Sequence, residues 1–229
     1  MQPGKAMSEP RFFSLDYVEH AVLHNGTKVV LRLVVPEDKE LLRAGFERLS
    51  PESRYARFFT PKPSLSDDEL SYLCEVDHEN HVAIGAVRDD ADPGAEPVGL
   101  GIARFIRLSD PPDIAEAAIA VTDDTQHQGL GRLLFLRLIA AAAERGIGRF
   151  RCEVLESNAK MAALLAQVAP DRSIAVGSGV MSIEIALPSV TPTQPPTGEP
   201  LQSPLYRLFR AVAANAVEWT SAVRNLWRR

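Results

Sequence analysis

The sequence predicts an α/β fold, of the α+β kind, in which helices flank a mixed, mostly antiparallel sheet of about six to seven strands. Three strand-like stretches, at residues 81–87, 98–107 and 115–121, follow one another across short turns, which favours an antiparallel meander. A long apolar helix at 131–145 then separates the third stretch from a further strand at 150–155. A helix that crosses over in this way makes the two strands it joins parallel.

Composition narrows the class of protein. The chain has 229 residues, 45% hydrophobic and 24% charged, so it is long enough for one substantial domain with appendages. Its net charge of −5 argues against nucleic acid as a partner. Cys74 and Cys152 lie in apolar patterns, and we expect buried thiols in a reducing, cytoplasmic compartment. Cysteines and histidines show no zinc-like spacing, so no metal is expected.

Four parts are expected along the chain. An N-terminal extension covers 1–25, and its first fifteen residues mix proline, glycine and charge. The folded domain covers 26–187, and a linker with six prolines covers 188–204. No transmembrane segment is expected, because Arg137 interrupts the longest apolar helix.

The residue pattern of the fourth part, residues 205–229, predicts an amphipathic basic helix. Apolar residues recur at alternating spacings of four and three from Leu205 to Leu226, and five arginines occupy much of the remainder. A stripe this apolar must be buried. We expect it to dock on its own domain or to pair with a second copy in a homodimer, and an anionic membrane surface is the alternative.

The elements before the meander follow from periodicity and from helix start signals. Residues 27–35 have a strand pattern, and 36–49 carry a helical stripe of apolar residues. Ser50-Pro51 predicts the start of a second helix, with serine as N-cap and proline in the first turn. Ser66 predicts the start of a third, because Glu69 completes a capping box.

The elements after the long helix are shorter. Gly146 and Gly148 are expected to end that helix. Following the strand at 150–155, a helix over 157–168 and a hairpin that turns across 176–179 complete the domain.

Two glycines, Gly129 and Gly131, mark the start of the long helix. The first amides of a helix lack intrahelical partners and the helix dipole is positive there, so this end can bind an anion such as a phosphate. The alternative is that the glycines only let helix and strand pack closely. A Walker A loop is excluded, because Arg132 and Leu133 follow Gly131 instead of lysine and serine or threonine. A Rossmann fingerprint is excluded because Leu134 stands in place of its third glycine.

The surrounding residues resemble the GNAT family of N-acetyltransferases. Its Q-x-x-G-x-G/A signature is matched by Gln126-His127-Gln128-Gly129-Leu130-Gly131. Residues 49–59 reproduce the L-S-P-E-S-x-Y-x-R-F-F segment of bacterial protein lysine acetyltransferases, and 115–121 and 154–161 fit two further motifs of that branch. The resemblance spans roughly residues 26–187. It implies the GNAT fold and acetyl-CoA as co-substrate.

The resemblance also implies which residues would bind the coenzyme. The amides of the signature loop would hold the pyrophosphate, and backbone groups of Ile119 and Val121 would hydrogen-bond the pantetheine arm and polarise the thioester carbonyl. Arg132 would add positive charge or be a solvated helix residue. Asn158 would contact the coenzyme or be a polar residue of a first helical turn.

Glu116 is the expected general base. It lies on an apolar strand, on the same face as Ala118, where burial would raise its pKa into a useful range. The alternative is an exposed glutamate on an open sheet face, and His127 is a second, weaker candidate for the base. The family's leaving-thiolate acid, a tyrosine, is replaced by Leu165, and the Gly-Phe that ends the same helix is replaced by Ala169-Pro170.

These residues predict an acetyl-CoA-dependent N-acetyltransferase that acts by direct attack in a ternary complex, with a protein lysine as acceptor. Two other functions stay open. One is acetylation of a small amine. The other is a degenerate domain that binds an acyl-CoA as a sensor or interaction protein, which the replacements at Leu165 and Ala169-Pro170 would allow.

Overall fold

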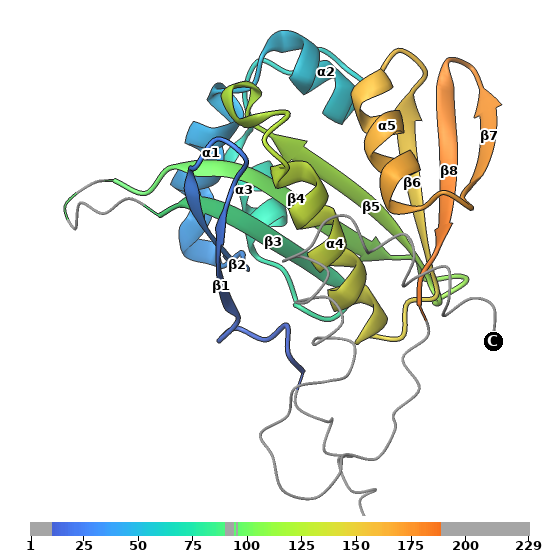
Figure 1. The fold of residues 1–229 in the computed structure, drawn as a ribbon, viewed down its shortest axis with the longest axis horizontal. Helices are drawn as coiled ribbons and strands as arrows, with labels where there is room; N and C mark the ends of the chain where they lie inside the picture. The colour runs from blue at the N-terminus through green and yellow to red at the C-terminus, as the bar shows by residue number, and fades with distance from the viewer. Residues whose placement is uncertain (1–10, 90–93, 95, 189–229) are drawn as a thin grey trace, which may run out of the picture.

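A computed structural model describes residues 11–89, 94 and 96–188. One sheet runs through this part in the order β1-β2-β3-β4-β5-β6-β8-β7 (Figure 1). Its eight strands are β1 (Val18–Val22), β2 (Lys28–Leu33), β3 (His81–Arg88), β4 (Gly99–Arg107), β5 (Ile114–Val121), β6 (Arg149–Leu155), β7 (Ser173–Gly177) and β8 (Val180–Ala186). The sheet is mixed and mostly antiparallel, as predicted: β3, β4 and β5 form the meander, and β5 and β6 are parallel.

The helices begin at the predicted start signals. They are α1 (Lys39–Glu47) after a 3₁₀ turn η1 (Pro36–Asp38), α2 (Pro51–Phe58), α3 (Asp67–Cys74), a 3₁₀ turn η2 (Asp123–Thr125), α4 (Leu130–Ala143) and α5 (Ala159–Val168). The Ser50 hydroxyl accepts from the amide of Ser53, and Ser66 and Glu69 form the capping box. Both predicted caps are confirmed. They could be predicted because each depends only on residues three positions apart.

The sheet has eight strands where six to seven were expected, because β1 was not predicted. Its sequence, Val-Glu-His-Ala-Val, has no apolar run, and its side chains are exposed or half-buried along its whole length. It is an edge strand with one partner, β2. Such a strand needs no apolar face of its own, so periodicity does not reveal it.

Residues 11–25 belong to the fold, although the sequence analysis assigned them to an extension. Phe13, Tyr17 and Leu23 are buried in the main core cluster. Glu19 of β1 accepts two hydrogen bonds from Arg137 of α4, from Nε at 2.7 Å and from Nη2 at 2.6 Å. The Arg137 side chain is only 4% exposed, so this ion pair ties the first strand to the central helix.

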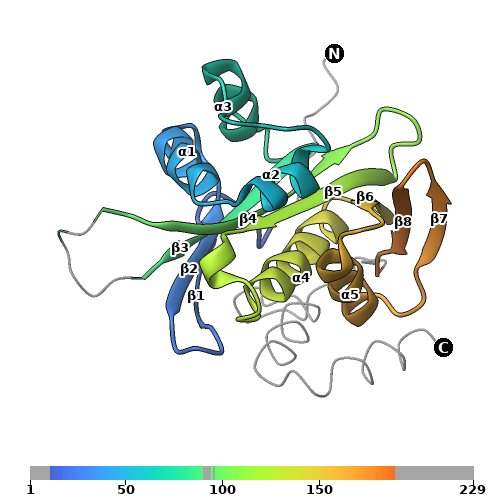
Figure 2. The same ribbon diagram turned by 90° about the horizontal axis from the view of Figure 1, so that it is seen from above.

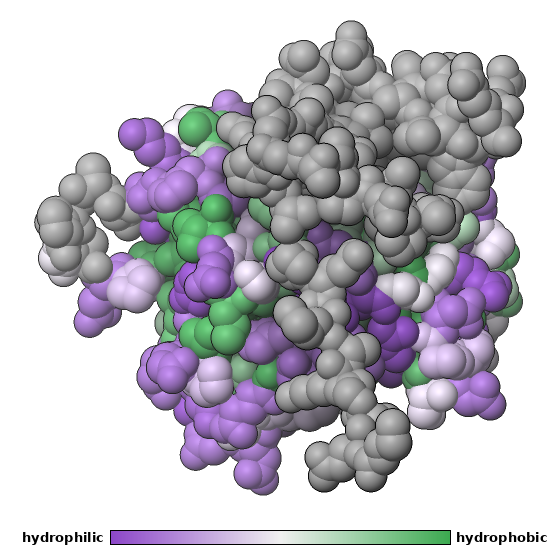
Figure 3. Space-filling model, turned by 90° about the horizontal axis from the view of Figure 1, so that it is seen from below, coloured by the Kyte–Doolittle hydropathy of each residue, from purple (hydrophilic) through white to green (hydrophobic). Residues whose placement is uncertain are grey.

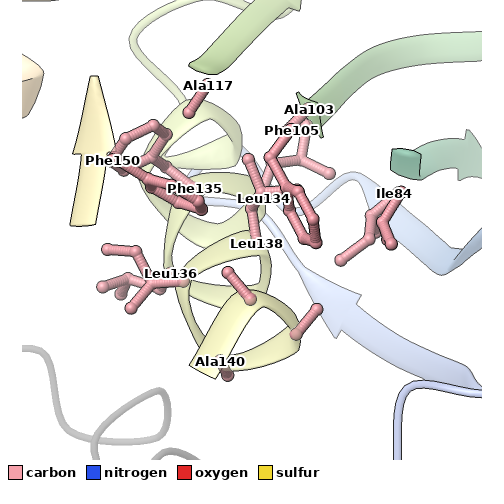
Figure 4. Close-up of a cluster of buried hydrophobic side chains, with 14 of the residues drawn as sticks. Ile84, Ala103, Phe105, Ala117, Leu134, Phe135, Leu136, Leu138, Ala140 and Phe150 are labelled. Atoms are coloured by element: carbon pink, nitrogen blue, oxygen red, sulfur yellow. The ribbon is translucent and has the colours of Figure 1, made fainter. Parts of the chain in front are cut away.

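The helices cover both faces of the sheet, with α1, α2 and α3 on one side and α4 and α5 on the other (Figure 2). The main core lies between the sheet and α4. Leu134 and Leu138 point toward Ile84 and Phe105 of the sheet, and Phe135 meets Phe150 with ring centroids 6.0 Å apart (Figure 4). As predicted, α4 is apolar around most of its circumference, and nearly all of it is buried.

Several expectations concern the surface and the ends of the chain. The thiols of Cys74 and Cys152 are buried and free, as predicted. No helix within the described residues is long and apolar enough to cross a membrane. On the face drawn in Figure 3, groups of hydrophobic side chains are interspersed with hydrophilic ones. The predicted linker at 188–204, apart from residue 188, and the helix at 205–229 lie outside the described residues.

Loss of the carboxylate of Glu19, which pairs with the nearly buried Arg137, should destabilise the fold. We expect Glu19→Gln to lower the free energy of unfolding by about 3 kcal/mol, because a nearly buried guanidinium would lose its counter-charge. Glu40→Gln is the matched control, since Glu40 is 81% exposed in its pair with Arg43 and such pairs contribute less than about 1 kcal/mol. Chemical denaturation measures both. Equal losses in the two variants would contradict the assignment.

Candidate functional site

A cleft opens where β5 and β6 separate. The two strands pair over only three positions, from Ile114–Arg149 to Glu116–Arg151. Beyond these positions β5 continues to Val121 and β6 to Leu155 without pairing with each other, and the two strands diverge (Figure 1). The cleft between them and the neighbouring helices has a volume of about 1530 Å³.

The open side of β5 presents backbone groups to this cleft. The Thr122 amide donates to Leu100 O across to β4, and the alternation of an antiparallel ladder then directs the amides of Ile119 and Val121 away from β4. The carbonyl of Val121 already faces that side, where it accepts from Gln126 Nε2 at 3.3 Å. Unpaired strand groups of this kind can bind an extended ligand as a further strand would.

The start of α4 forms one end of the cleft. Gly129 is its N-cap, with a φ of +87° that side chains rarely allow, and a Cβ there would lie 3.0 Å from His24 Nε2. A Cβ on Gly131 would make ordinary contacts of 3.6–3.9 Å with Leu164, Val121 and Ile119. The conformation of the loop therefore requires glycine at 129 but not at 131. With no side chain at the N-cap, the first amides of α4 are free to bind an anion.

Three basic side chains surround this helix start. Arg132 and His127 line the cleft, and His127 itself has a φ of +62°. His24, from the turn between β1 and β2, also lines it, and its amide donates to Gln128 O at 3.1 Å. The sequence analysis missed His24 because it lies about a hundred residues from the loop and follows the unpredicted strand.

Gln126 holds the loop in place. Its Nε2 lies within 3.3 Å of both Ser53 Oγ and Val121 O, and its Oε1 accepts from Lys160 Nζ at 2.7 Å. One side chain thus connects α2, the end of β5 and the first turn of α5. In this structure Gln126 positions the loop through these contacts.

The remaining predicted residues, Gln128, Leu130 and Asn158, differ in whether their side chains line the cleft. Leu130 is fully buried in the core, and Gln128 contributes a carbonyl to the contact with His24, so neither side chain lines the cleft. Asn158 lines the cleft but also caps α5, because its Oδ1 accepts from the amide of Met161 at 3.0 Å. Asn158 is thus the N-cap of α5, one position before its first turn, and contact of its side chain with the coenzyme stays a prediction.

Glu116 lies in the cleft at the last position where β5 still pairs with β6. The burial expected for it is wrong: the Glu116 side chain is exposed. The reason is that Glu116 lies on the wall of the open cleft and not in the core between the sheet and a helix. Its position keeps it accessible both to an acceptor and to water.

The position of the usual thiolate acid is closed to the cleft. Leu165 is fully buried in the core, whereas its neighbour Leu164 lines the cleft. Leu165 has no proton to donate, so this position of α5 supplies no acid.

The wall of the cleft also includes two arginines that were not among the predicted site residues, Arg57 of α2 and Arg104 of β4. Both also line an apolar recess of about 90 Å³ between the sheet and α1 and α2. Burial lowers the pKa of Arg57, and burial together with the charge of Arg57 lowers the pKa of Arg104 to about 10. These two residues are far apart in the sequence, and only the packing of α2 against the sheet places both on the wall of one cleft.

Comparisons with known proteins agree with this geometry. An acetyltransferase Pat from Mycolicibacterium smegmatis is 31% identical over 205 residues, which are 83% of this chain and 56% of that protein. The crystal structure of the GNAT domain of S. lividans PAT is 30% identical with a TM-score of 0.66, over 74% of this chain and 97% of that domain. The structure of a cAMP-binding acyltransferase from Mycobacterium smegmatis is 26% identical with a TM-score of 0.53, over 90% of this chain and 56% of that protein.

The chain thus spans little more than half the length of the two mycobacterial proteins. The model of the acetyltransferase (GNAT) family matches residues 40–168, which is more than half of this chain. The matched range includes β5, the glycine loop, α4 and most of the cleft wall. The chain belongs to the GNAT family of N-acetyltransferases, whose co-substrate is acetyl-CoA.

Proposed function

We propose that this protein transfers the acetyl group of acetyl-CoA to the side-chain amine of a lysine in another protein. The observation that carries the proposal is the unpaired edge of β5 beside the glycine-capped start of α4. A coenzyme with a peptide-like arm and a pyrophosphate needs these two features side by side. The resemblance of residues 49–59 to protein lysine acetyltransferase domains supports a lysine acceptor.

The coenzyme's phosphates would bind at the free amides of α4. The proposal assigns the backbone of Gly129 and Gly131 to the pyrophosphate and places His24, His127 and Arg132 around it. Backbone groups of Ile119 and Val121 would hold the pantetheine arm and stabilise the oxyanion that forms on the thioester carbonyl.

Glu116 would act as the general base. A lysine amine is protonated at neutral pH, so a proton must leave before the nitrogen attacks the thioester carbon. The exposed carboxylate of Glu116 would take that proton directly or through a water. As the carbon–sulfur bond breaks, the thiolate would take a proton from solvent, since Leu165 has none to give.

A small amine is the second candidate acceptor. The observation that favours it is the apolar recess beside the cleft, which is the size of a small side chain rather than of a protein surface. Release of free CoA thiol, measured with acetyl-CoA against a panel of proteins and small amines, separates the two acceptors. If none of the amines in the panel causes release of CoA thiol, and acetyl-CoA still binds, the acyl-CoA sensor is favoured instead.

Replacement of the N-cap glycine should abolish coenzyme binding. We expect Gly129→Glu to weaken acetyl-CoA affinity about 100-fold or more, because a side chain and a negative charge would occupy the phosphate site. Gly146→Glu is the matched control: Gly146 also has a positive φ, of +71°, but a Cβ there meets nothing within 4 Å. Calorimetry on the two folded variants measures the difference. Unchanged affinity in Gly129→Glu would show that the phosphates bind elsewhere.

Removal of the proposed base should slow turnover and spare binding. We expect Glu116→Gln to lower kcat by about 10²–10⁴-fold at neutral pH, and the loss to shrink at high pH as the free amine forms without help. Glu153→Gln is the control, because Glu153 also lines the cleft but accepts from Ser182 Oγ on β8. Acetyl-CoA affinity should be unchanged in both variants. A loss of less than about threefold in Glu116→Gln across the pH range would exclude Glu116 as the base.

A further inference from the structure

Two guanidinium groups, one from α2 and one from β4, are on the wall of the cleft. Arg57 and Arg104, here called the guanidinium pair, line both the cleft and the apolar recess. Arg104 is 5% exposed and Arg57 is half-buried. Burial lowers the pKa of both arginines, and the charge of Arg57 lowers the pKa of Arg104 further.

The contacts of Arg104 are to neutral groups. Its Nη2 donates to Leu73 O at 3.2 Å, and its Nη1 lies 3.1 Å from His81 Nε2. Burial, followed by the charge of Arg104, lowers the pKa of His81 to about 4, so this imidazole is neutral at pH 7 and accepts the hydrogen bond. The charge of Arg104 is therefore not balanced by either contact.

Arg57 is not balanced either. Its guanidinium carbon lies 5.1 Å from the centroid of the neighbouring Phe58 ring. Within residues 11–89, 94 and 96–188, neither member of the guanidinium pair forms an ion pair with a carboxylate. Arg32 and Arg137 show the contrast, since each is paired with a carboxylate at 2.5–2.6 Å.

Two desolvated like charges without a counter-ion are costly to a fold. A bound anion would remove that cost, and a guanidinium presents paired donors that match the two oxygens of a carboxylate. The groups are on the wall of a cleft, where a ligand can reach them. A charge arrangement of this kind, retained in a cleft, indicates a binding site rather than a structural pair.

The position of the pair relative to Glu116 indicates which ligand it would meet. Arg104 is opposite Ala118 in the β4–β5 ladder, so Glu116 is its diagonal neighbour on the same face. Diagonal neighbours in an antiparallel pair are about 7–8 Å apart. The phosphate site at α4 is at the other end of β5. An anion at the guanidinium pair would thus lie beside the acceptor amine and away from the phosphates.

We propose that Arg57 and Arg104 bind a carboxylate of the acceptor, so that the enzyme selects an amine that carries a carboxylate close by. This inference rests on the proposed function. For a protein acceptor it means a lysine with a glutamate or aspartate next to it in the sequence. Arg57 and Arg104 are then specificity-determining residues, and Glu116 acts on the amine that they position.

The test compares two lysine peptides, one with glutamates on both sides of the lysine and one with glutamines there. We expect wild-type kcat/KM to favour the glutamate peptide about 10- to 100-fold, the effect of a hydrogen bond to a charged group. Arg57→Gln should bring this ratio close to one and leave the KM for acetyl-CoA unchanged. Arg57→Lys keeps the charge and should restore part of the preference.

Arg57 is the residue to replace, because Arg104 is buried and its variants risk unfolding. Arg43→Gln is the matched control, since Arg43 is an arginine on the outer side of α1, paired at 2.8 Å with Asp67. It should keep the full preference. A glutamate-to-glutamine ratio that is the same in wild type and Arg57→Gln would overturn the proposal.

A binding measurement separates this proposal from the proposed function. Peptide affinity is measured by calorimetry on enzyme saturated with CoA, which has no acetyl group to transfer. Charge-dependent binding that Arg57→Gln abolishes, without acetylation of either peptide in the assay, would support the guanidinium pair and reject the lysine acetyltransferase function. Equal acetylation of both peptides by wild type would support that function and reject the pair as a carboxylate site.

A last arm identifies the source of the carboxylate. Acetyl-CoA and succinyl-CoA are compared as donors with the glutamine peptide. If wild type prefers succinyl-CoA and Arg57→Gln loses that preference, the pair binds a carboxylate of the acyl group, and the assignment to the acceptor is overturned. Preference for acetyl-CoA in both enzymes would support the assignment to the acceptor.

Discussion

The separation of β5 from β6 after three paired positions is the constraint on which the site depends. A central strand normally satisfies its backbone groups on both sides, and the cost of leaving them unpaired is avoided only if water or a ligand occupies the gap. The start of α4 is at the end of β5, where Gly131 is close to Val121 and Ile119. The open strand edge and the positive helix end are therefore neighbours at this break in the ladder.

Charge is distributed unevenly along the cleft. Around the start of α4, the side chains of His24 and His127 are exposed, so solvent screens their interaction with an anion. Around Arg57 and Arg104 the cleft wall is desolvated, and any anion there interacts in a lower dielectric. The exposed part suits a ligand shared by the whole family, and the desolvated part suits discrimination between acceptors.

Features with local causes could be predicted from the sequence, and features with distant causes could not. The caps at Ser50 and Ser66, the conformation of Gly129 and the parallel crossing of β5 and β6 each depend on neighbouring residues or on chain direction. The edge strand β1 gave no periodic signal. The exposure of Glu116 depends on which elements pack over β5, and the role of Gln126 depends on α2 and α5, so neither could be inferred from the motif that contains the residue.

The range by which the family is recognised is smaller than the part of the chain that folds. Residues 40–168 include neither β1 and β2 nor β7 and β8. A fragment with those limits would turn β3 and β6 into free edges and uncover buried side chains beside β2 and β8, such as Ile84 and Cys152. Uncovered strand edges recruit other strands, so such a fragment would be prone to self-association.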